Sequence, residues 1–471
     1  MADKQERKLP KAAEDKIDEV LSKTFTTGYG ITPDDQQNAA ALRREFLDDE
    51  VKMLAYDTND FTIYPMISKQ QVNSTVVKYA VFNQHGRTGH SRFVREVGVA
   101  SINDPNIRQR TVAMKFISDT KQQSIAAGLV NNIADPMQVL TDDAIAVIAK
   151  SIEWAIFYGD AALSADPDPQ AGIEFDGLHK LIDQKTNVMD LRGRTLTEAD
   201  LNKAAVIVGK GYGKATDAFM PIGVQADFTN SLLERQRALM PAQSDGFATG
   251  FAVTEFLSTR GRIRLHGSTI MENDTVLIED KAPQQNAPLP PKAVTAKVAE
   301  GAGLFRDEDL TEHEYKVVVH SDEAESVPSQ AVKAAVNAKN QEVTLSIELQ
   351  PMYNAQPQFV VIYRKGLETG YFYEIARVAV SKAVNNVITF VDKNEIIPET
   401  TDVFVGEMSP QVISLLELLP MMRLPLAQMN ATITFTVLWY GALALYAPKK
   451  WVRIKNVKYI PAVASDVMPH Q

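Results

Sequence analysis

The sequence lacks cysteine altogether, over a length of 471 residues. This absence excludes disulfide bonds, thiolate zinc sites and cysteine nucleophiles. Residues 1–23 alternate acidic and basic side chains and include no apolar core segment, so they do not form a secretory signal. We therefore expect a protein that stays in the cytoplasm in which it is made.

Positive charge is also scarce, because 49 Lys and Arg residues stand against 59 Asp and Glu, a formal net charge of -10. A general nucleic-acid-binding protein needs a surplus of cations to neutralise phosphates, so only weak, non-specific contact with DNA is expected. Apolar residues make up 45% and charged residues 23%, as in ordinary globular proteins. The length predicts roughly two to four domains.

Motifs for catalysis or cofactor binding are missing as well. "VGKGYGKAT" (208–216) is close to a phosphate-binding loop, but Val208 stands where its first glycine is needed and Ala215 where its hydroxyl is needed, so a flexible turn is predicted. His313 and His320 lie seven residues apart in an expected strand, hence on opposite faces, and are expected to be solvated rather than metal ligands. The sequence predicts a protein that is not an enzyme and has no catalytic residue, cofactor or metal.

Charge is distributed unevenly along the chain. Residues 67–116 carry eight Lys or Arg against two acids, a net charge of +6, whereas residues 135–183 carry ten acids against two Lys, a net charge of -8. These two segments complement each other electrostatically, although two solvated faces of unlike sign would give the same pattern.

Within the basic segment, strand-like stretches at 74–82, 92–100 and 110–118 surround a polar, glycine-rich tip, "NQHGRTGHSR" (83–92). This pattern predicts an extended hairpin, which has few residues for a core of its own and needs a surface to lie on. A nucleic-acid-binding tip is the alternative. Because aromatic residues are sparse there, contact with an acidic protein surface is favoured.

The clearest helix signal is "MQVLTDDAIAVIAKSIEWAIFYGD" (137–160), with four isoleucines at helical spacing, Thr141 as the expected N-cap and Gly159 at its end. Helices and buried strands then alternate up to a proline-rich boundary at 281–294. Beyond it, short alternating strands up to about Pro398 predict a β-sandwich module.

No charged residue occurs from Leu424 to Pro448, which suggests either a membrane anchor or a buried strand. As a helix, the 17 residues from Ala431 to Ala447 would span about 25 Å, less than a hydrocarbon core of about 30 Å. "ATITFTV" also alternates with a period of two. We therefore expect a strand here and a second one after Pro448, the two closing one sheet.

Several long strings resemble the major capsid proteins of tailed bacteriophages with the Hong Kong 97 phage fold. "SIEWAIFYGDAAL" (151–163), "GIEFDGLHKLID" (172–183) and "VLWYGALALYAPKKWVRIKNVKYI" (437–460) are similar to those of large contractile-tailed phages of Gram-positive hosts. The resemblance implies an α+β fold with an inserted all-β domain of immunoglobulin-like or fibronectin type. The implied order is an N-terminal arm (1–66), an extended loop (67–116), a peripheral domain with a spine helix (117–194), an axial domain (195–282), the insertion (283–402), more axial domain (403–430) and C-terminal peripheral strands (431–471).

The same resemblance implies that the chain assembles with itself, as hexamers and pentamers, into an icosahedral shell around phage double-stranded DNA. The extended loop would contact a neighbour through Lys78, His85, Arg87, His90, Arg92 and Arg95. The acidic acceptor surface would consist of Asp142, Asp143, Glu153 and Asp160. Portal and other head proteins, and a maturation protease cutting between Lys23 and Thr24, are implied partners in a virion assembled in the host cytoplasm, without a membrane. A surface adhesin or decoration protein built on the β-sandwich is the alternative.

Overall fold

The computed structural model of the chain describes residues 60–84, 96, 98, 104–129, 135–169, 171–182, 185–233, 253–273, 276–277, 286–322, 324–350, 355–427 and 431–459. All of these residues except Asp135 belong to one compact unit. The expected arm before residue 60, the candidate cleavage position at Lys23 and Thr24, and residues 85–95 of the expected hairpin lie outside the described residues.

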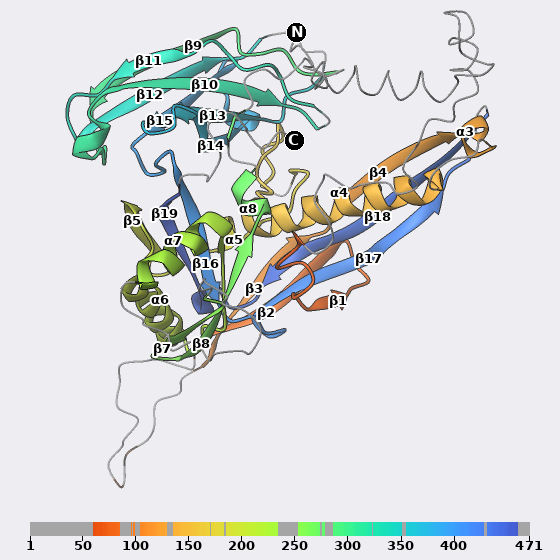
Figure 1. Ribbon diagram of the computed structural model, residues 1–471, viewed down its shortest axis with the longest axis horizontal. Coiled ribbons are helices and arrows are strands. Elements are labelled where there is room, and N and C mark those ends of the chain that lie inside the picture. Colours follow the sequence, from red (N-terminus) through yellow and green to blue (C-terminus); the bar gives the residue numbers. More distant parts are fainter. Residues whose placement is uncertain are drawn as a thin grey trace, which may run out of the picture. The chain divides into compact units, whose positions relative to one another are not determined.

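A four-stranded sheet with one long helix along it encloses the first hydrophobic core (Figure 1). Its strands are ordered β1 (Lys69–Gln71), β17 (Ile413–Pro425), β18 (Thr432–Leu445) and β4 (Lys115–Ser124). The helix α4 (Pro136–Tyr158) buries Ile148, Ile152 and Ile156 against this sheet, and Trp439 lies in the same core. The predicted isoleucine stripe is therefore confirmed as the face that packs.

The start of α4 differs from the prediction, which placed the N-cap at Thr141. The helix begins at Pro136, because proline fits the first helical position, where no backbone N–H is needed. The Thr141 hydroxyl instead donates to the carbonyl oxygen of Met137, 2.7 Å away, inside the helix. The expected end is confirmed, since α4 stops at Tyr158 and the Gly159 N–H donates to the Ala155 carbonyl oxygen at 3.0 Å.

The uncharged stretch forms a strand, as its alternation predicts, and β18 pairs with both β17 and β4. The expectation that it closes one sheet together with the strand after Pro448 is wrong. A short 3-10 turn, η4 (Pro448–Lys450), redirects the chain, and β19 (Trp451–Lys458) joins a second sheet. Alternation specifies which face of a strand is buried but not which strands pair.

This second sheet has six strands and its own core. The strand order is β5 (Val188–Arg194), β19, β16 (Thr400–Gly406), β6 (Asp217–Pro221), β8 (Gly261–Ser268) and β7 (Glu255–Ser258). The helices α6 (Glu198–Lys210) and α7 (Ile222–Leu233) contribute Leu201 and Phe228 to its core. The stretch 403–430, expected in one domain, is thus divided, because β16 lies in this sheet and β17 in the other.

The glycine-rich stretch after α6 forms a turn, as predicted, rather than a phosphate-binding loop. The Gly211 N–H donates to the Ile207 carbonyl oxygen at 3.1 Å, and Tyr212 follows with a φ of 62°. Tyr212 is 91% exposed.

Residues 293–392 form two antiparallel sheets that share a third core. One sheet has the order β11 (Val332–Ala335), β10 (Glu312–His320), β13 (Phe359–Lys365), β14 (Phe372–Ala379), and the other β15 (Val387–Asp392), β12 (Gln341–Glu348), β9 (Ala293–Glu300). His313 is buried and its Nε2 lies 2.8 Å from the Asp309 carbonyl oxygen, so the expectation that it is solvated is wrong.

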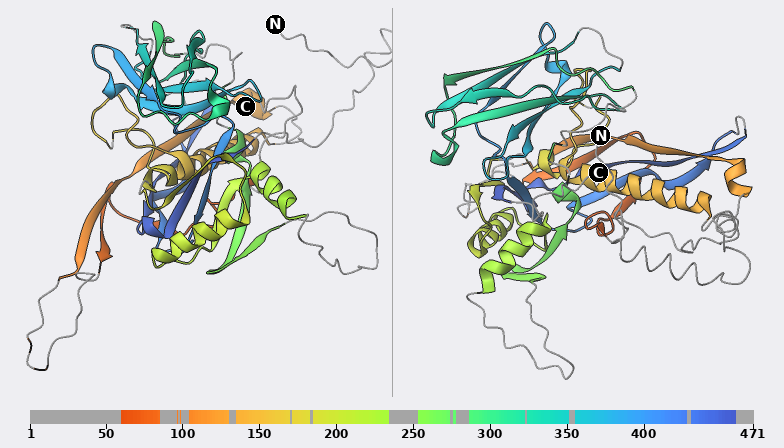
Figure 2. Two further views of the ribbon diagram at one scale, coloured as in Figure 1. Left: turned by 90° about the vertical axis from the view of Figure 1, so that its left-hand side faces the viewer. Right: turned by 45° about the horizontal axis from the view of Figure 1, so that its top comes forward.

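A ribbon of two antiparallel strands, β2 (Val76–Gln84) and β3 (Asn106–Ala113), precedes β4 along the chain. Figure 2 shows this orange ribbon projecting from the sheet that contains β4. It corresponds to the base of the predicted hairpin. The remaining short elements are α3 (Ile125–Leu129), α5 (Leu178–Leu181), α8 (Ile270–Asn273), η2 (Asp307–Asp309) and η3 (Val380–Lys382).

The packing of α4 predicts a large difference between two truncations on the same helix. Ile152→Ala should lower the free energy of unfolding by about 2–5 kcal/mol, because it leaves a cavity in a fully buried site. Val139→Ala, at a position that is 43% exposed, should change it by no more than about 0.5 kcal/mol. Urea denaturation of the unassembled chain measures both, and equal losses would contradict the assigned packing.

Candidate interaction surfaces

Glu153 does not belong to an acidic surface, contrary to the prediction. Its side chain is fully buried at the inner face of α4. The carboxylate accepts hydrogen bonds from the backbone N–H of Thr62 at 2.8 and 3.1 Å, from the Thr62 hydroxyl at 2.8 Å and from the Tyr64 N–H at 3.3 Å. Burial raises the pKa of Glu153, and these hydrogen bonds counteract part of the rise. Glu153 therefore holds the segment 60–67 on α4.

The other three predicted acceptor residues lie on or near the surface. Asp142 and Asp143 are exposed, and Asp160 is partly buried. The Nζ of Lys121 lies 2.6 Å from Asp143, and the Nζ of Lys180 lies 2.6 Å from Asp160. Each pair is therefore partly exposed and contributes only modestly to stability.

The β2–β3 ribbon presents one open face. Val76 is 46% and Ile107 56% exposed, and Lys78, Ala80 and Gln109 on the same face are exposed too. Lys78, one of the residues expected to contact a neighbour, is thus exposed, and that contact stays a prediction. His85, Arg87, His90, Arg92 and Arg95 lie outside the described residues.

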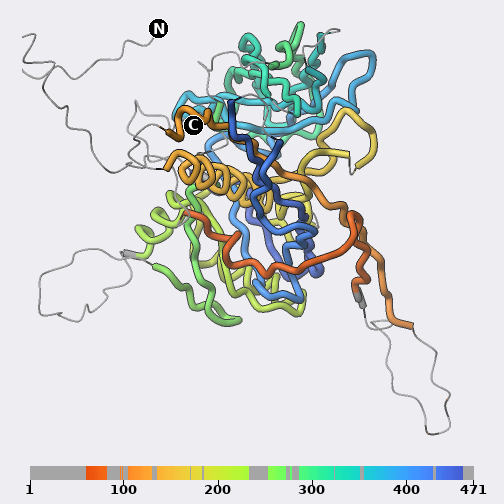
Figure 3. The backbone as a smooth tube through the Cα atoms, turned by 90° about the vertical axis from the view of Figure 1, so that its right-hand side faces the viewer, coloured from red at the N-terminus to blue at the C-terminus, as the bar shows by residue number. Residues whose placement is uncertain are grey.

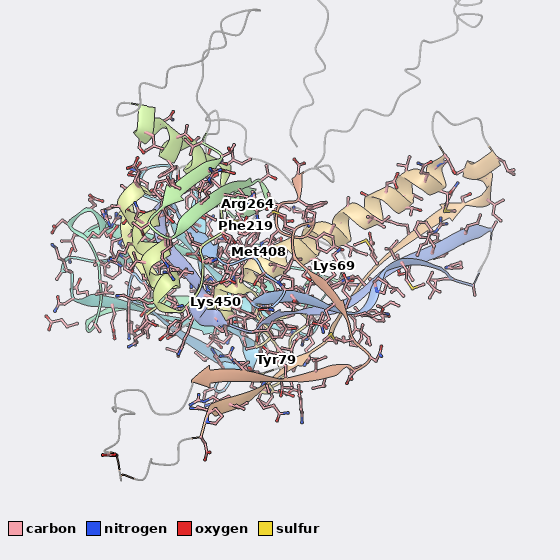
Figure 4. The ribbon with its side chains drawn as sticks, turned by 90° about the horizontal axis from the view of Figure 1, so that it is seen from below. Lys69, Tyr79, Phe219, Arg264, Met408 and Lys450 are labelled. Carbon is pink, nitrogen blue, oxygen red and sulfur yellow. The ribbon has the colours of Figure 1, made fainter. Side chains whose placement is uncertain are left out.

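The opposite face of the ribbon rests on the protein. The ring of Tyr79 meets that of Tyr446 edge-on, with centroids 4.9 Å apart, and the Tyr446 hydroxyl donates to the Gln70 side-chain oxygen at 3.2 Å. Burial raises the pKa of Tyr79, while the nearby Arg110 lowers it. Figure 4 shows Tyr79 on the ribbon and Lys69 on β1. These contacts determine the direction in which the ribbon leaves the sheet.

The β-sandwich is attached through its four-stranded sheet. The Arg377 guanidinium stacks over the Trp154 ring of α4 at 4.3 Å, and Glu374 holds it with bonds of 2.7 and 3.0 Å. The Gln358 side chain accepts hydrogen bonds from the Ser164 hydroxyl and the Ala165 N–H. Apolar contacts complete the attachment, from Leu163 to Phe359 and Val361, and from Leu277 to Val318 and Phe372. The sandwich therefore presents its other, three-stranded sheet outward.

One buried charge cluster in the six-stranded sheet was not predicted from the sequence. The Asp217 carboxylate is fully buried and lies 2.8 Å from the Arg264 guanidinium and 2.9 Å from His266 Nε2. Burial alone would raise the pKa of Asp217, but the hydrogen bonds from His266, Thr216 and Arg264 lower it overall. Since β6 and β8 are paired here, the cluster fixes their register. Within the described ranges, no group of three or more His, Asp or Glu side chains is placed to hold a metal ion.

The helices in the described part of the chain are all too short or too polar to cross a membrane. Figure 3 shows the path of the uncharged stretch, which runs as blue strand beside the gold α4. The stretch from Thr432 to Leu445 is therefore a sheet strand, as predicted.

The chain is similar to proteins of bacteriophage heads. The sequence profile of the family described as SU10 major capsid protein matches residues 99–313. The chain is 60% identical over 445 residues to the putative major capsid protein of Enterococcus phage phiEF24C, covering 94% of this chain and 96% of that protein. It is 58% identical over 448 residues to the major capsid protein of Staphylococcus phage K, covering 95% and 96% respectively.

Solved structures give a more distant likeness. The holo-SrpI encapsulin complex from Synechococcus elongatus PCC 7942 matches 91% of this chain and 98% of its own with 10% identity and a TM-score of 0.43. A structure from Mycobacterium phage Bobi matches 89% and 97% with 9% identity and a TM-score of 0.44. Because both TM-scores are below 0.5, the family assignment depends on the sequence relatives.

The hydrogen bonds of Glu153 predict a strong effect of its removal. Glu153→Ala should lower the free energy of unfolding by about 3–5 kcal/mol, because buried N–H groups of Thr62 and Tyr64 lose their acceptor and a cavity is left. Asp142→Ala, the same kind of change at an exposed position of α4, should change it by about 0.5 kcal/mol at most. If chemical denaturation gave equal losses for the two variants, Glu153 would not be the residue that holds the segment 60–67 on α4.

The raised pKa of Glu153 also predicts a pH dependence. Between the unfolded value of about 4.5 and the higher native value, the folded chain binds more protons than the unfolded chain, so this contribution is complete below pH 4.5 and is lost as the pH rises through the native pKa. The stability of the unaltered chain relative to Glu153→Gln should therefore fall as the pH rises from 4 to about 8. Denaturation curves across that range test it, and a constant difference would contradict it.

Proposed function

This chain belongs to the family of phage major capsid proteins, and we propose that it self-assembles as hexamers and pentamers into the icosahedral shell that encloses phage double-stranded DNA. The observation that carries the proposal is 60% identity sustained over 94% of the chain to a protein of that family. Identity at this level over nearly the whole length implies the same cores and therefore the same subunit. As a capsid protein, the chain is a component of the virion.

We further propose the Hong Kong 97-type arrangement for the subunit. The sheet with α4 as its spine helix would form the peripheral domain, and the six-stranded sheet the axial domain. The expected boundaries are adjusted in three places, since β5 and β19 belong to the sheet of the proposed axial domain while β17 pairs with peripheral β18. Residues 1–66 remain the proposed N-terminal arm and 67–116 the proposed extended loop.

The isolated ribbon supports the extended-loop assignment. A two-stranded ribbon is marginally stable in water, and this one leaves Val76, Lys78 and Ile107 exposed on an open face. A neighbouring subunit would cover that face. The net charge of +6 on the loop segment and -8 on residues 135–183 would steer the two subunits into register.

We propose that the β-sandwich is an immunoglobulin-like or fibronectin-type insertion on the outer surface of the shell. Two antiparallel sheets of four and three strands around one core support this assignment. Its attachment to Trp154 and Leu163 fits a role in stiffening the subunit, whereas its exposed three-stranded sheet leaves a surface for adsorption.

The proposed partners are other copies of this chain, the portal and other head proteins, and a maturation protease that cuts between Lys23 and Thr24. Contact with packaged DNA would be weak and non-specific, since the chain has a net charge of -10. The relatives do not support the alternative of a surface adhesin or decoration protein, because they are major capsid proteins over almost their whole length.

Charge reversal in the extended loop tests the proposed assembly. Purified chain should form closed shells, or rings of five and six subunits, in negative-stain electron microscopy. Replacing Arg87, Arg92 and Arg95 by Glu should reduce shell yield at least about tenfold, because like charges then meet on the acceptor surface.

The matched control replaces Lys292, Lys297 and Lys339 of the sandwich by Glu, which changes the net charge equally at exposed positions and should leave the shells intact. Normal shells from the loop variant would refute the loop contact. A chain that stays monomeric without any substitution would refute the shell function.

A further inference from the structure

The glycine-rich turn at the end of α6 has no part in the function proposed so far. It spans residues 209–214, "GKGYGK", and its Tyr212 is 91% exposed. The backbone N–H groups of Gly211, Tyr212 and Gly213 donate to carbonyl oxygens of α6, and that of Lys214 donates to the Glu407 carboxylate at 3.0 Å. These N–H groups are therefore not available to cradle a phosphate, and a ligand of the turn has to be bound by side chains.

Cations from three parts of the chain meet at this turn. The short η4 turn lies directly against it, because a Cβ on Gly211 would collide with the backbone carbonyl group of Lys449. The connection between β7 and β8 reaches it too, since a Cβ on Gly209 would lie 2.7 Å from the Nε atom of Arg260. We call the cations gathered here the basic patch; they are Lys210, Lys214, Arg260, Lys449 and Lys450.

Most of the positive charge of the basic patch is unpaired. Lys450, labelled in Figure 4, lies 3.3 Å from the Glu407 carboxylate. The other four cations are exposed and have no ion pair within the described part of the chain. Five cations against one carboxylate give a local net charge of +4, although the whole chain carries -10. Like charges held this close repel one another, so a polyanion that covers the patch is attracted to it.

The chemistry of the basic patch fits the DNA backbone better than an acidic protein surface. Lysine is depleted in protein–protein interfaces, whereas Lys, Arg and Tyr side chains commonly contact phosphate oxygens. The hydroxyl of Tyr212, which stands between Lys210 and Lys214, can donate such a hydrogen bond. Separate cations on an open surface suit a polymer with regularly repeated phosphates rather than a single nucleotide.

We propose that the basic patch around Tyr212 is the surface through which this chain contacts the phosphate backbone of the packaged double-stranded DNA. The inference rests on the proposed shell function and gives the weak DNA contact a defined place on the subunit. It also gives the "GKGYGK" turn a role, in which side chains contact the outside of a duplex and no nucleotide pocket is formed.

The salt dependence of binding tests the patch. The unassembled full-length chain is titrated onto a fluorescent DNA duplex of about 30 base pairs, and anisotropy is followed from about 25 to about 200 mM KCl. Four unpaired cations should neutralise about four phosphates, so the logarithm of the binding constant should fall against the logarithm of the salt concentration with a slope of about -3.6.

Three neutralising substitutions should remove most of this effect. Lys210→Gln, Lys214→Gln and Lys449→Gln together should reduce the slope to about -0.9 and weaken binding at least about tenfold at about 50 mM KCl. Arginine at the same three positions keeps the charge and should keep the binding. The matched control is Lys297→Gln, Lys339→Gln and Lys382→Gln, three exposed lysines of the sandwich, and it should bind like the unaltered chain.

Photo-crosslinking tests the contact inside the particle. The photo-reactive residue p-benzoylphenylalanine in place of Tyr212 should attach the chain to DNA when DNA-filled heads are irradiated, because the exposed ring lies within the patch. The same residue in place of Lys297, exposed on β9 of the sandwich, should give no DNA adduct.

Two results would overturn this inference and leave the shell function intact. One is an unchanged salt slope for the three-glutamine variant of the patch. The other is a crosslink from position 212 to a second copy of the chain, with none to DNA, in heads that form and fill normally. Failure of the unaltered chain to form shells would overturn the shell function and this inference with it.

Discussion

The architecture depends on one buried carboxylate. Glu153 lies in the last quarter of α4 and accepts hydrogen bonds from the backbone N–H groups of Thr62 and Tyr64. From there the contacts continue outward. The Lys69 ammonium lies over the Tyr64 ring at 3.8 Å and 4.0 Å from Glu417, and Glu417 in turn accepts a hydrogen bond from the buried Trp439 indole at 3.0 Å. The chain entering from the N-terminus is thus tied to the helix and to both central strands of the long sheet.

The two sheets and α4 are closely packed, whereas the β2–β3 ribbon leaves one face exposed. The four-stranded sheet, the six-stranded sheet and α4 enclose two cores of buried apolar side chains, among them Ile152, Trp439 and Phe228, and close packing fixes the geometry of these elements. The β2–β3 ribbon, by contrast, rests one face on the first core through Val77, Tyr79 and Val112 and exposes Val76 and Ile107 on its other face. The buried cores thus stabilise the two sheets and α4. The exposed apolar face of the β2–β3 ribbon is left for the proposed contact with another copy of the chain.

Local patterns predicted the elements well but not their partners. The isoleucine stripe of α4 and the alternation of β18 depend on residues a few positions apart, and both predictions were confirmed. Glu153 looked like another surface acid, because its hydrogen-bond donors are about ninety residues earlier in the chain. The separation of β18 and β19 into different sheets escaped prediction for the same reason, and so did the Asp217, Arg264 and His266 cluster. The periodicity of the sequence predicts which face of an element is buried. Which strands pair, and which distant groups hydrogen-bond to a side chain, depends on the whole fold.

The attachment of the sandwich has a consequence for how such chains evolve. Its four-stranded sheet is covered on both faces, by its own core on one side and by Leu163, Leu277 and Trp154 on the other. A descendant that lost residues 293–392 by a single deletion would expose those three side chains at once and leave Glu174 without the nearby Arg377 charge. Loss of the sandwich would therefore remove an apolar contact surface and a neighbouring charge together. Substitutions on its three-stranded sheet leave these contacts in place, whereas substitutions on the sheet that faces α4 alter them.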